Sequence, residues 1–305
     1  MTEVTTKAVT VQVPATSANL GPGFDSLGLA LGLYDSITAM VSEDEGVLIE
    51  VEGEGTGQVA LDASHLVARA MALGFTALGA RPSGFVLRCV NVIPHGRGLG
   101  SSAAAIIAGL TLARGMVTGG DQLLSDHELL QLALSLEPHP DNLAAALHGG
   151  FTTAWIADES AHVVRVDVHQ DIHAVVAIPD FQVPTAHARS ALPATVLRSD
   201  ASFNIARSAL LVHAMTRAPE LLMDATEDRL HQEPRRSMYS SSMALTDSLR
   251  EAGVAAVISG AGPTVLALGP AEQLDVVRLT AGADWRVLAL PVAALGAHIH
   301  PAAGA

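Results

Sequence analysis

The chain has 305 residues, of which 49% are hydrophobic, and its 31 acidic side chains outnumber 17 basic ones to give a net charge of −14. A chain of this length can bury a large core and form two domains. Its negative charge, with no basic patch in the sequence, excludes a nucleic acid as a partner because phosphate backbones would be repelled.

The first half of the chain is predicted to mix strands and helices. Alternation at Val9, Val11 and Val13 predicts a first strand, and residues 14–28 follow as a segment rich in glycine and proline. This segment is a candidate site because it holds polar residues in an apolar neighbourhood. The other expected strands are residues 33–41, 47–51 and 84–93, and the expected helices are residues 65–78, 101–116, 126–136 and 141–147. Ser125 and Glu128 have the spacing of a capping box for the third of these helices.

From Gly150 the pattern changes to strands, which predicts a domain boundary near residue 165 and two domains, residues 1–165 and 166–305. We find no internal repeat and no low-complexity linker, so the two halves are expected to share an interface. The expected strands are residues 151–156, 163–168, 173–178, 254–259, 264–268 and 286–290, and the expected helices are residues 203–216, 242–252 and a helix from residue 271.

Cysteine content and apolar stretches indicate the compartment. Cys89 is the only cysteine, which excludes an internal disulfide and a cysteine-based zinc site, and we expect it to be buried in a strand. Residues 1–10 lack the apolar segment of a secretion signal, and the longest apolar stretches, residues 103–113 and 287–297, are too short to cross a bilayer. We therefore expect a cytoplasmic protein with no membrane partner.

The most informative segment is residues 94–104, which read Pro-His-Gly-Arg-Gly-Leu-Gly-Ser-Ser-Ala-Ala. A predicted strand precedes this glycine-rich loop and a predicted helix of small residues follows it. The N–H groups of the loop and of the helix N-terminus should therefore converge on one spot, where they favour an anion such as phosphate.

Other loop types fit this segment less well. A Walker A loop requires a lysine, and the segment has none. Gly98, Gly100 and Ala103 match a dinucleotide-binding fingerprint, with Asp121 as the ribose-binding acid, but no strand precedes that acid. A simple chain reversal would not explain two serines at the start of the helix.

Three segments together resemble the GHMP small-molecule kinases and, within that family, the homoserine kinases. They are Pro-Ala-Thr-Ser-Ala-Asn-Leu-Gly-Pro-Gly-Phe-Asp at residues 14–25, the loop at residues 94–104, and Ser-Gly-Ala-Gly-Pro-Thr at residues 259–264. Further support comes from His-Pro-Asp-Asn at residues 139–142, Thr-Ala-His-Ala-Arg-Ser-Ala-Leu-Pro at residues 185–193, and Leu-His-Gln at residues 230–232, shortly before Arg235. An ordered set of motifs is more specific than any one of them.

The resemblance implies an α+β fold of two domains. The N-terminal domain would be like the second domain of ribosomal protein S5, the C-terminal domain would be ferredoxin-like, and the nucleotide would lie between them. It also implies transfer of the γ-phosphoryl group of ATP to the hydroxyl of L-homoserine, giving O-phospho-L-homoserine in threonine biosynthesis, with Mg²⁺ as cofactor and a homodimer as the assembly. Another GHMP kinase acting on a sugar or isoprenoid alcohol, or a non-catalytic nucleotide-binding protein, stays open at this point.

The same resemblance assigns roles to residues. Those expected at the nucleotide are Pro94, His95, Gly96, Arg97, Gly98, Leu99, Gly100, Ser101, Ser102, Ala103, Ala104, Asn142, Gly260 and Gly262. Those expected at the amino-acid substrate are Asn19, Asp25, His139, Arg189 and Arg235. Ser102 and Glu137 match the Mg²⁺-binding positions, and their oxygen atoms suit that ion. Asp25, Ser102 and Glu137 are the expected catalytic residues, with Asp25 as the candidate general base.

Charge supports the substrate assignment, because a zwitterion needs a fork-shaped cation for its carboxylate and oxygen acceptors for its ammonium group. Arg189 and Arg235 match the carboxylate-binding positions, and Asp25 suits the ammonium group or the reacting hydroxyl. The sequence departs from the family pattern at Pro138, where glycine is common, and at Pro234 and Ser240, where tyrosine and proline are usual. The adenine is expected near residues 65–67.

Overall fold

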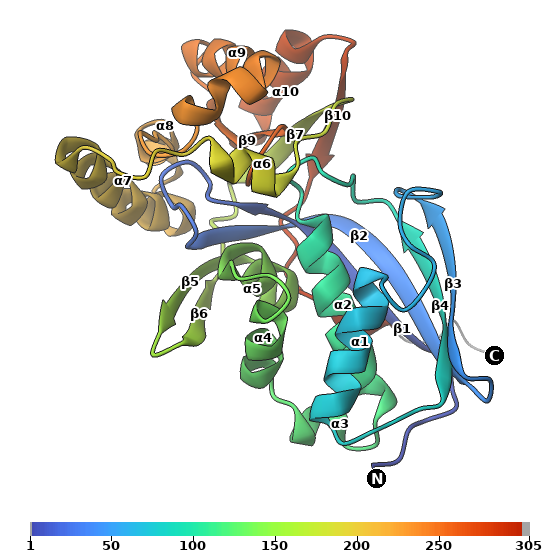
Figure 1. Cartoon of the computed structure of the whole chain (residues 1–305). Coiled ribbons are helices and arrows are strands. Elements are labelled where there is room, and N and C mark those ends of the chain that lie inside the picture. The colour runs from blue at the N-terminus through green and yellow to red at the C-terminus, as the bar shows by residue number, and fades with distance from the viewer. Residues whose placement is uncertain (1, 301–305) are drawn as a thin grey trace.

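The computed structural model describes residues 2–300, which build two β-sheets that carry helices (Figure 1). The strands of the larger sheet are β1 (Val9–Ala18), β2 (Leu27–Ser42), β3 (Gly46–Gly53), β4 (Gly84–Asn91), β5 (Phe151–Ala157), β6 (Ser160–Val166) and β11 (His298–His300). Their order is β11-β1-β2-β4-β3, with β5 beside β2 and β6 beside β5. The β3–β4 pair is parallel and the other pairs are antiparallel.

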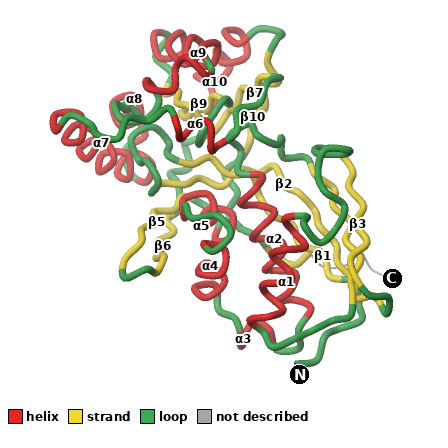
Figure 2. The backbone as a smooth tube through the Cα atoms, in the orientation of Figure 1, coloured by secondary structure: helices red, strands yellow, loops and turns green. Residues whose placement is uncertain are grey.

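The helices of the first half gather on one face of this sheet (Figure 2). They are α1 (Leu66–Ala77), α2 (Ser101–Met116), α3 (Gly120–Leu123), α4 (Asp126–Leu134) and α5 (Pro140–His148). Small residues on α2 allow α1 to approach closely, since a Cβ atom on Gly109 would lie 2.5 Å from the carbonyl oxygen of Val67. Helix α2 therefore packs as the central helix of this layer, between α1 and α5.

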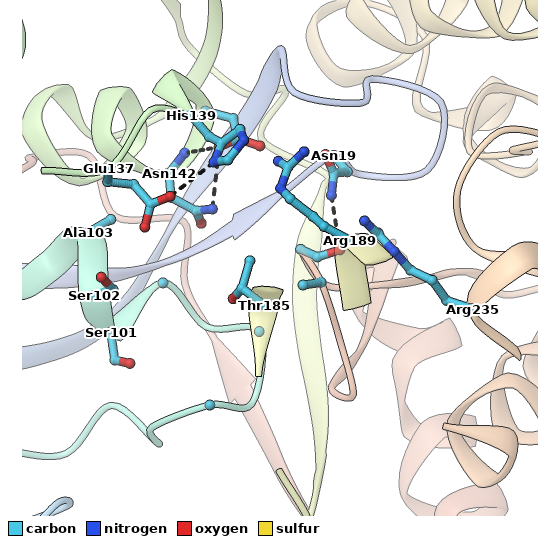
Figure 3. Close-up of a pocket in the computed structure, with 16 residues that line it drawn as sticks. Asn19, Ser101, Ser102, Ala103, Glu137, His139, Asn142, Thr185, Arg189 and Arg235 are labelled. Carbon is cyan, nitrogen blue, oxygen red and sulfur yellow. Dashed lines mark hydrogen bonds and ion pairs between the residues drawn. The ribbon is translucent and has the colours of Figure 1, made fainter. Parts of the chain in front are cut away.

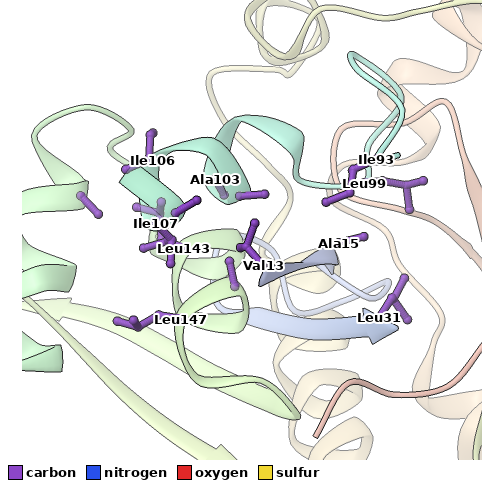
Figure 4. Packing of buried hydrophobic residues seen from close by; sticks show 14 of the residues in the cluster. Val13, Ala15, Leu31, Ile93, Leu99, Ala103, Ile106, Ile107, Leu143 and Leu147 are labelled. Atoms are coloured by element: carbon purple, nitrogen blue, oxygen red, sulfur yellow. The ribbon is translucent and has the colours of Figure 1, made fainter. Parts of the chain in front are cut away.

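The main core lies between this helical layer and the strands (Figure 4). Val13 and Ala15 of β1, Ile107 of α2 and Leu143 of α5 are all fully buried there. Burial of a side chain such as Ile107 or Leu143 stabilises the fold by about 1.5–3 kcal/mol. This packing fixes the N-terminal end of α2 beside the end of β1, which positions the glycine-rich loop.

The second sheet is built by the later part of the chain. Its strands are β7 (His173–Pro179), β8 (Ala255–Ile258), β9 (Val265–Gly269) and β10 (Trp285–Leu290), in the order β10-β7-β9-β8. Its helical elements are α6 (Thr185–Ser190), α7 (Arg198–Thr216), η1 (Pro219–Leu221), α8 (Leu222–Ala225), η2 (Glu233–Met238), α9 (Ser240–Glu251) and α10 (Ala271–Ala281). A chain order of strand, helices, two strands, helix and strand with this sheet order is the ferredoxin-like arrangement that the resemblance implied.

The strands and helices predicted from the sequence are present, with shifts at their ends. Helix α2 begins at Ser101 as expected, the capping box of Ser125 and Glu128 is formed, and Cys89 is buried in β4. Part of the predicted loop at residues 14–28 is strand instead, because β1 continues past an irregularity between Pro14 and Ala15 and pairs with β2 as far as Ala18. The segment 185–190 forms a helix that the sequence analysis did not predict.

The chain leaves the larger sheet after Val166 and builds the second sheet. Its last strand, β11, belongs to the larger sheet again, where it pairs with β1. The division into residues 1–165 and 166–305 stays a prediction. Asp121 lies in α3, where it pairs with Arg114 at 3.3 Å, and it does not follow a strand, which removes the dinucleotide-binding alternative. Within residues 2–300, no helix is long and apolar enough to cross a membrane.

Candidate active site

The glycine-rich loop takes a shape that only glycine adopts readily. Gly96, Gly98 and Gly100 have φ angles of 65°, 77° and 69°, in the left-handed region. Gly100 is the N-cap residue of α2, and no side chain caps that helix. The N–H groups of its first turn therefore lack a side-chain partner, and the positive end of the helix dipole faces the same place. This end of α2 is suited to a phosphate group.

Neighbouring segments hold the loop by its carbonyl groups. The N–H group of Thr16 donates to the carbonyl of Leu99 at 3.1 Å, and the hydroxyl of Ser259 donates to the carbonyl of Gly98 at 2.6 Å. The N–H group of Thr264 donates to the carbonyl of Arg97 at 3.2 Å. None of these three bonds uses an N–H group of the loop. The second sheet thus fixes the loop through its turn at residues 259–264.

A cavity of about 200 Å³ lies beside the loop (Figure 3). The predicted site residues that line it are Asn19, Gly96, Gly98, Gly100, Ser101, Ser102, Ala103, Glu137, His139, Asn142, Arg189, Arg235 and Gly260. Asp141, Thr185 and Ala261 also line it, and the sequence analysis did not assign them to the site. All three lie inside motifs that were recognised, so their neighbours were the available signal.

Other predicted residues lie outside this cavity. The guanidinium of Arg97 donates to the carbonyls of Pro179 and Asp180 at 3.0 and 2.7 Å, so it joins the loop to the second sheet. Leu99 and Ala104 are fully buried in the core. Pro94 and Gly262 do not line the cavity, and His95 lines a second one described below. These residues do not line the cavity beside the loop, and their assignment to the nucleotide stays a prediction.

One side of the cavity carries oxygen atoms next to the loop. Ser102 comes from the first turn of α2, and Glu137 comes from the segment before α5 (Figure 3). The Oε1 atom of Glu137 lies 3.0 Å from Nδ1 of His139. The side-chain oxygen of Asn142 accepts a hydrogen bond from the hydroxyl of Thr16 at 2.7 Å, which orients this amide at the start of α5. Hydroxyl and carboxylate oxygens therefore share one wall.

The opposite side carries Arg189 and Arg235, and Asp25, which does not itself line the cavity, is paired with Arg189. Arg189 of α6 donates to both carboxylate oxygens of Asp25, at 2.5 and 3.2 Å. Both side chains are about 30% exposed, with 29% for Arg189 and 32% for Asp25. Arg235 is 1% exposed yet lines the cavity. Asn19 accepts from the N–H group of Asp25 and donates to the carbonyl of Gly260, which ties the loop after β1 to the turn after β8.

Asp141 is a buried acid on the cavity wall. It is 3% exposed, and burial raises the pKa of its carboxyl to about 6, against a hydrogen bond from the N–H group of Asn142 that lowers it. That bond lies in the first turn of α5, whose N-cap residue His139 makes no side-chain capping bond. Asp141 lines the cavity, and the charges of Asp25, His139 and Arg189 also act on its carboxyl.

A second cavity of about 330 Å³ adjoins the first, and Ser101 and Ser102 line both. Apolar side chains such as Ile37, Val59 and Val67 line it together with His65 and His95. Burial lowers the pKa of both histidines, so both rings are neutral at pH 7. The cavity lies at the region where the sequence analysis expected the adenine.

Two family models and several named relatives match this chain. The model of the GHMP kinase N-terminal domain matches residues 65–150, and the model of the GHMP kinase C-terminal domain matches residues 206–284. A homoserine kinase of Streptomyces avermitilis is 51% identical over 97% of this chain and 97% of its own length. A homoserine kinase of Streptomyces coelicolor is 50% identical over 98% of this chain and 96% of its own length.

Solved structures show the same fold. The crystal structure of homoserine kinase from Cytophaga hutchinsonii has a TM-score of 0.85 at 25% identity, and the match covers 98% of this chain and 100% of that one. The L. major mevalonate kinase has a TM-score of 0.70 at 12% identity, covering 96% of this chain and 98% of that one, which shows a shared fold alone. The chain therefore belongs to the GHMP kinase family, in its homoserine kinase branch.

Proposed function

We propose that this chain is a homoserine kinase, which transfers the γ-phosphoryl group of ATP to the hydroxyl of L-homoserine and forms O-phospho-L-homoserine for threonine biosynthesis in the cytoplasm. The observation that carries this proposal is the make-up of the first cavity. A phosphate-binding loop borders one side of it, and Arg189 and Arg235 border the other. Phosphoryl transfer requires these two kinds of group to lie in one cavity, because the acceptor hydroxyl must meet the γ-phosphorus.

The nucleotide would lie across the two adjoining cavities. Its phosphates would accept hydrogen bonds from N–H groups of residues 96–103, at the positive end of α2. Its adenine would occupy the second cavity, where apolar side chains contact a flat ring. Ser101 and Ser102 would lie between base and phosphates, since they line both cavities.

The residues present fit a magnesium ion. Ser102 and Glu137 supply two hard oxygen ligands on one wall, beside the place proposed for the phosphates. Across residues 2–300, no group of three or more His, Cys, Asp or Glu side chains is placed to hold a metal ion by itself. This suits Mg²⁺, which binds one or two protein oxygens together with substrate phosphates and waters. The ion would neutralise charge on the phosphate oxygens.

The amino acid would replace the ion pair between Asp25 and Arg189. Its carboxylate would pair with Arg189 and Arg235, and its ammonium group would pair with Asp25, so each charge that the substrate separates regains a partner. Asn19 would keep the loop of Asp25 in place, and His139 would lie on the side of the phosphates. Asp25 pairs with Arg189 in the free chain and would pair with the ammonium group in the complex, so its carboxylate would stay engaged with a cation in both states. We propose that positioning and charge stabilisation, without a dedicated base, carry the transfer.

The proposal is tested by measuring ADP release from magnesium-ATP with purified protein and four acceptors: homoserine, threonine, mevalonate and galactose. We expect homoserine to be used with a far higher kcat/KM than the others, and mass spectrometry to identify O-phosphohomoserine. Faster turnover of mevalonate or galactose would support the second candidate, another GHMP kinase, since neither substrate offers a carboxylate and an ammonium on one carbon. A homodimer, which the family resemblance implies, is tested by light scattering.

A further inference from the structure

His231 is a fully buried histidine with a defined protonation state. It lies between α8 and η2, and its Nδ1 atom is 3.3 Å from a terminal nitrogen of Arg235. Its Nε2 atom is 2.7 Å from the carbonyl oxygen of Gly21. A guanidinium can only donate a hydrogen bond and a carbonyl can only accept one. The ring is therefore neutral, accepts at Nδ1 and donates from Nε2.

These two bonds join the parts of the chain that build the charged side of the cavity. Arg235 belongs to η2, and Gly21 belongs to the loop between β1 and β2 that also carries Asn19 and Asp25. The Nε atom of Arg235 donates to the carbonyl of Ala188 at 2.9 Å. Nε and one terminal N–H group are thus engaged within the protein, the Tyr239 hydroxyl also interacts with this guanidinium, and the residue still lines the cavity.

Phe24, in the same loop, lies against three side chains: His231, Arg189 and Arg235. Its ring stacks on His231, with centroids 5.2 Å apart and an interplanar angle of 28°. The guanidinium groups of Arg189 and Arg235 lie 5.6 and 5.8 Å from its centroid. Both distances are within the range of a cation–π interaction. Phe24 thus gives the two arginines, which come from α6 and η2, a common surface.

Asp228 holds the backbone of the segment that carries His231. The Oδ2 atom of Asp228 accepts from the N–H groups of His231 and Gln232 at 3.0 and 2.8 Å. Its distance to Nε2 of His231 is 3.8 Å, which is too long for a hydrogen bond. Asp228 therefore binds only the backbone of this segment, and the ring nitrogens of His231 bond to Arg235 and Gly21.

We propose that His231 and Phe24 are positioning residues for the amino-acid carboxylate. Neither would touch the substrate: the neutral ring orients Arg235, and the phenyl ring spaces Arg235 from Arg189 so that both guanidinium groups can reach one carboxylate. This inference rests on the proposed function. It adds that the binding of the amino acid, and not of the nucleotide, depends on these two side chains.

The arrangement makes amino-acid binding sensitive to acid. A protonated ring would place an N–H group of Nδ1 against the guanidinium of Arg235, which has no acceptor. The charged groups that face the ring are Arg235, which opposes its protonation, and Asp228 and Asp25, which favour it, while burial lowers the pKa of His231. Arg189 contacts Phe24, and the Phe24 ring stacks on the ring of His231. Acidification that protonates His231 breaks its bond to Arg235, so the KM for homoserine should rise.

The test compares His231→Leu, which removes both bonds, with His231→Gln, whose amide can accept and donate. We expect His231→Leu to raise the KM for homoserine roughly 10- to 100-fold, the loss that corresponds to one hydrogen bond with a charged partner. The KM for ATP should stay within about twofold, and His231→Gln should recover most of the loss. Phe24→Leu provides a second variant if His231→Leu does not fold, with the same expected split between the two KM values. In His231→Gln the rise of the KM for homoserine at acidic pH should be smaller than in the wild type.

His148→Gln is the matched control. His148 ends α5, burial lowers its pKa, and it lines neither cavity, so its replacement should leave both KM values unchanged. Folded His231→Leu and Phe24→Leu variants with an unchanged KM for homoserine would overturn the inference, as would equal rises of the KM for homoserine and for ATP. If the wild type releases no ADP with homoserine, the proposed function fails instead, so the two failures are distinguishable.

Discussion

The sharpest structural prediction concerns Gly98, where one added methyl group disturbs the phosphate loop without removing a functional side chain. Gly98 has a φ angle of +77°, and a Cβ atom there would lie 2.3 Å from the carbonyl oxygen of Ser259 and 2.9 Å from that of Gly262. Ordinary contacts of this kind are 3.4–4 Å long. In Gly98→Ala, the loop and the turn of the second sheet must therefore separate by roughly 1 Å, since a packed interior has no space to absorb the overlap.

The size of the effect follows from two costs. A left-handed backbone costs an L-residue about 1–2 kcal/mol, and overpacking a closed contact costs about 1–3 kcal/mol more. We expect Gly98→Ala to lower the free energy of unfolding by about 2–5 kcal/mol. Gly253→Ala is the matched control, because Gly253 has a φ angle of +82° and no atom within 4 Å of its added Cβ. It should show the backbone cost alone, about 1–2 kcal/mol.

The assay is chemical denaturation of the wild type and both variants, followed by the KM for ATP of each. Gly98→Ala should raise the KM for ATP because the loop N–H groups move with the loop, whereas Gly253→Ala should keep the wild-type value. Equal losses of stability in the two variants, or an unchanged KM for ATP in Gly98→Ala, would refute the reasoning.

Three further predictions follow from the same site. Ser102→Ala and Glu137→Gln should each lower kcat at least about tenfold, because each removes a proposed magnesium ligand; an unchanged kcat in a magnesium titration would contradict their role. Arg189→Ala should raise the KM for homoserine about 10- to 100-fold and leave Asp25 unpaired, so an effect on the KM for ATP alone would count against it. Asp35 is 4% exposed, and burial raises the pKa of its carboxyl to about 6 from an unfolded value near 3.8. Between these values the folded state binds the proton more tightly, so the Asp35 contribution to stability falls as pH rises through this window and stays lost above pH 6. Relative to the wild type, Asp35→Asn should gain up to about 3 kcal/mol of unfolding free energy between pH 4 and 7; a difference that does not change with pH in denaturation experiments would disprove this.

Local rules account for the parts of the fold that the sequence predicted well. The start of α2 at Ser101 follows from the glycines of the loop before it and from the small helical residues after them. The start of α4 follows from the capping box of Ser125 and Glu128. These features depend on neighbours in the chain, so their spacing alone is sufficient.

Features that depend on distant partners were not accessible in the same way. Strand β11 forms because residues 298–300 pair with β1, almost the whole chain away. Arg97 lies in the phosphate loop, yet its guanidinium donates hydrogen bonds to the carbonyls of Pro179 and Asp180. The pairing of Arg189 with Asp25 joins groups that the resemblance assigned to the two ends of one substrate. Motifs placed these residues in a common site, but only the fold brings them into contact.

The most direct test of the central claim is a crystal structure of the chain with magnesium, a non-hydrolysable ATP analogue and homoserine. Our account predicts the triphosphate against the N–H groups of residues 96–103, the amino-acid carboxylate on Arg189 and Arg235, and its ammonium group on Asp25. Nucleotide bound elsewhere, or an amino acid bound while Asp25 and Arg189 still pair with each other, would contradict it.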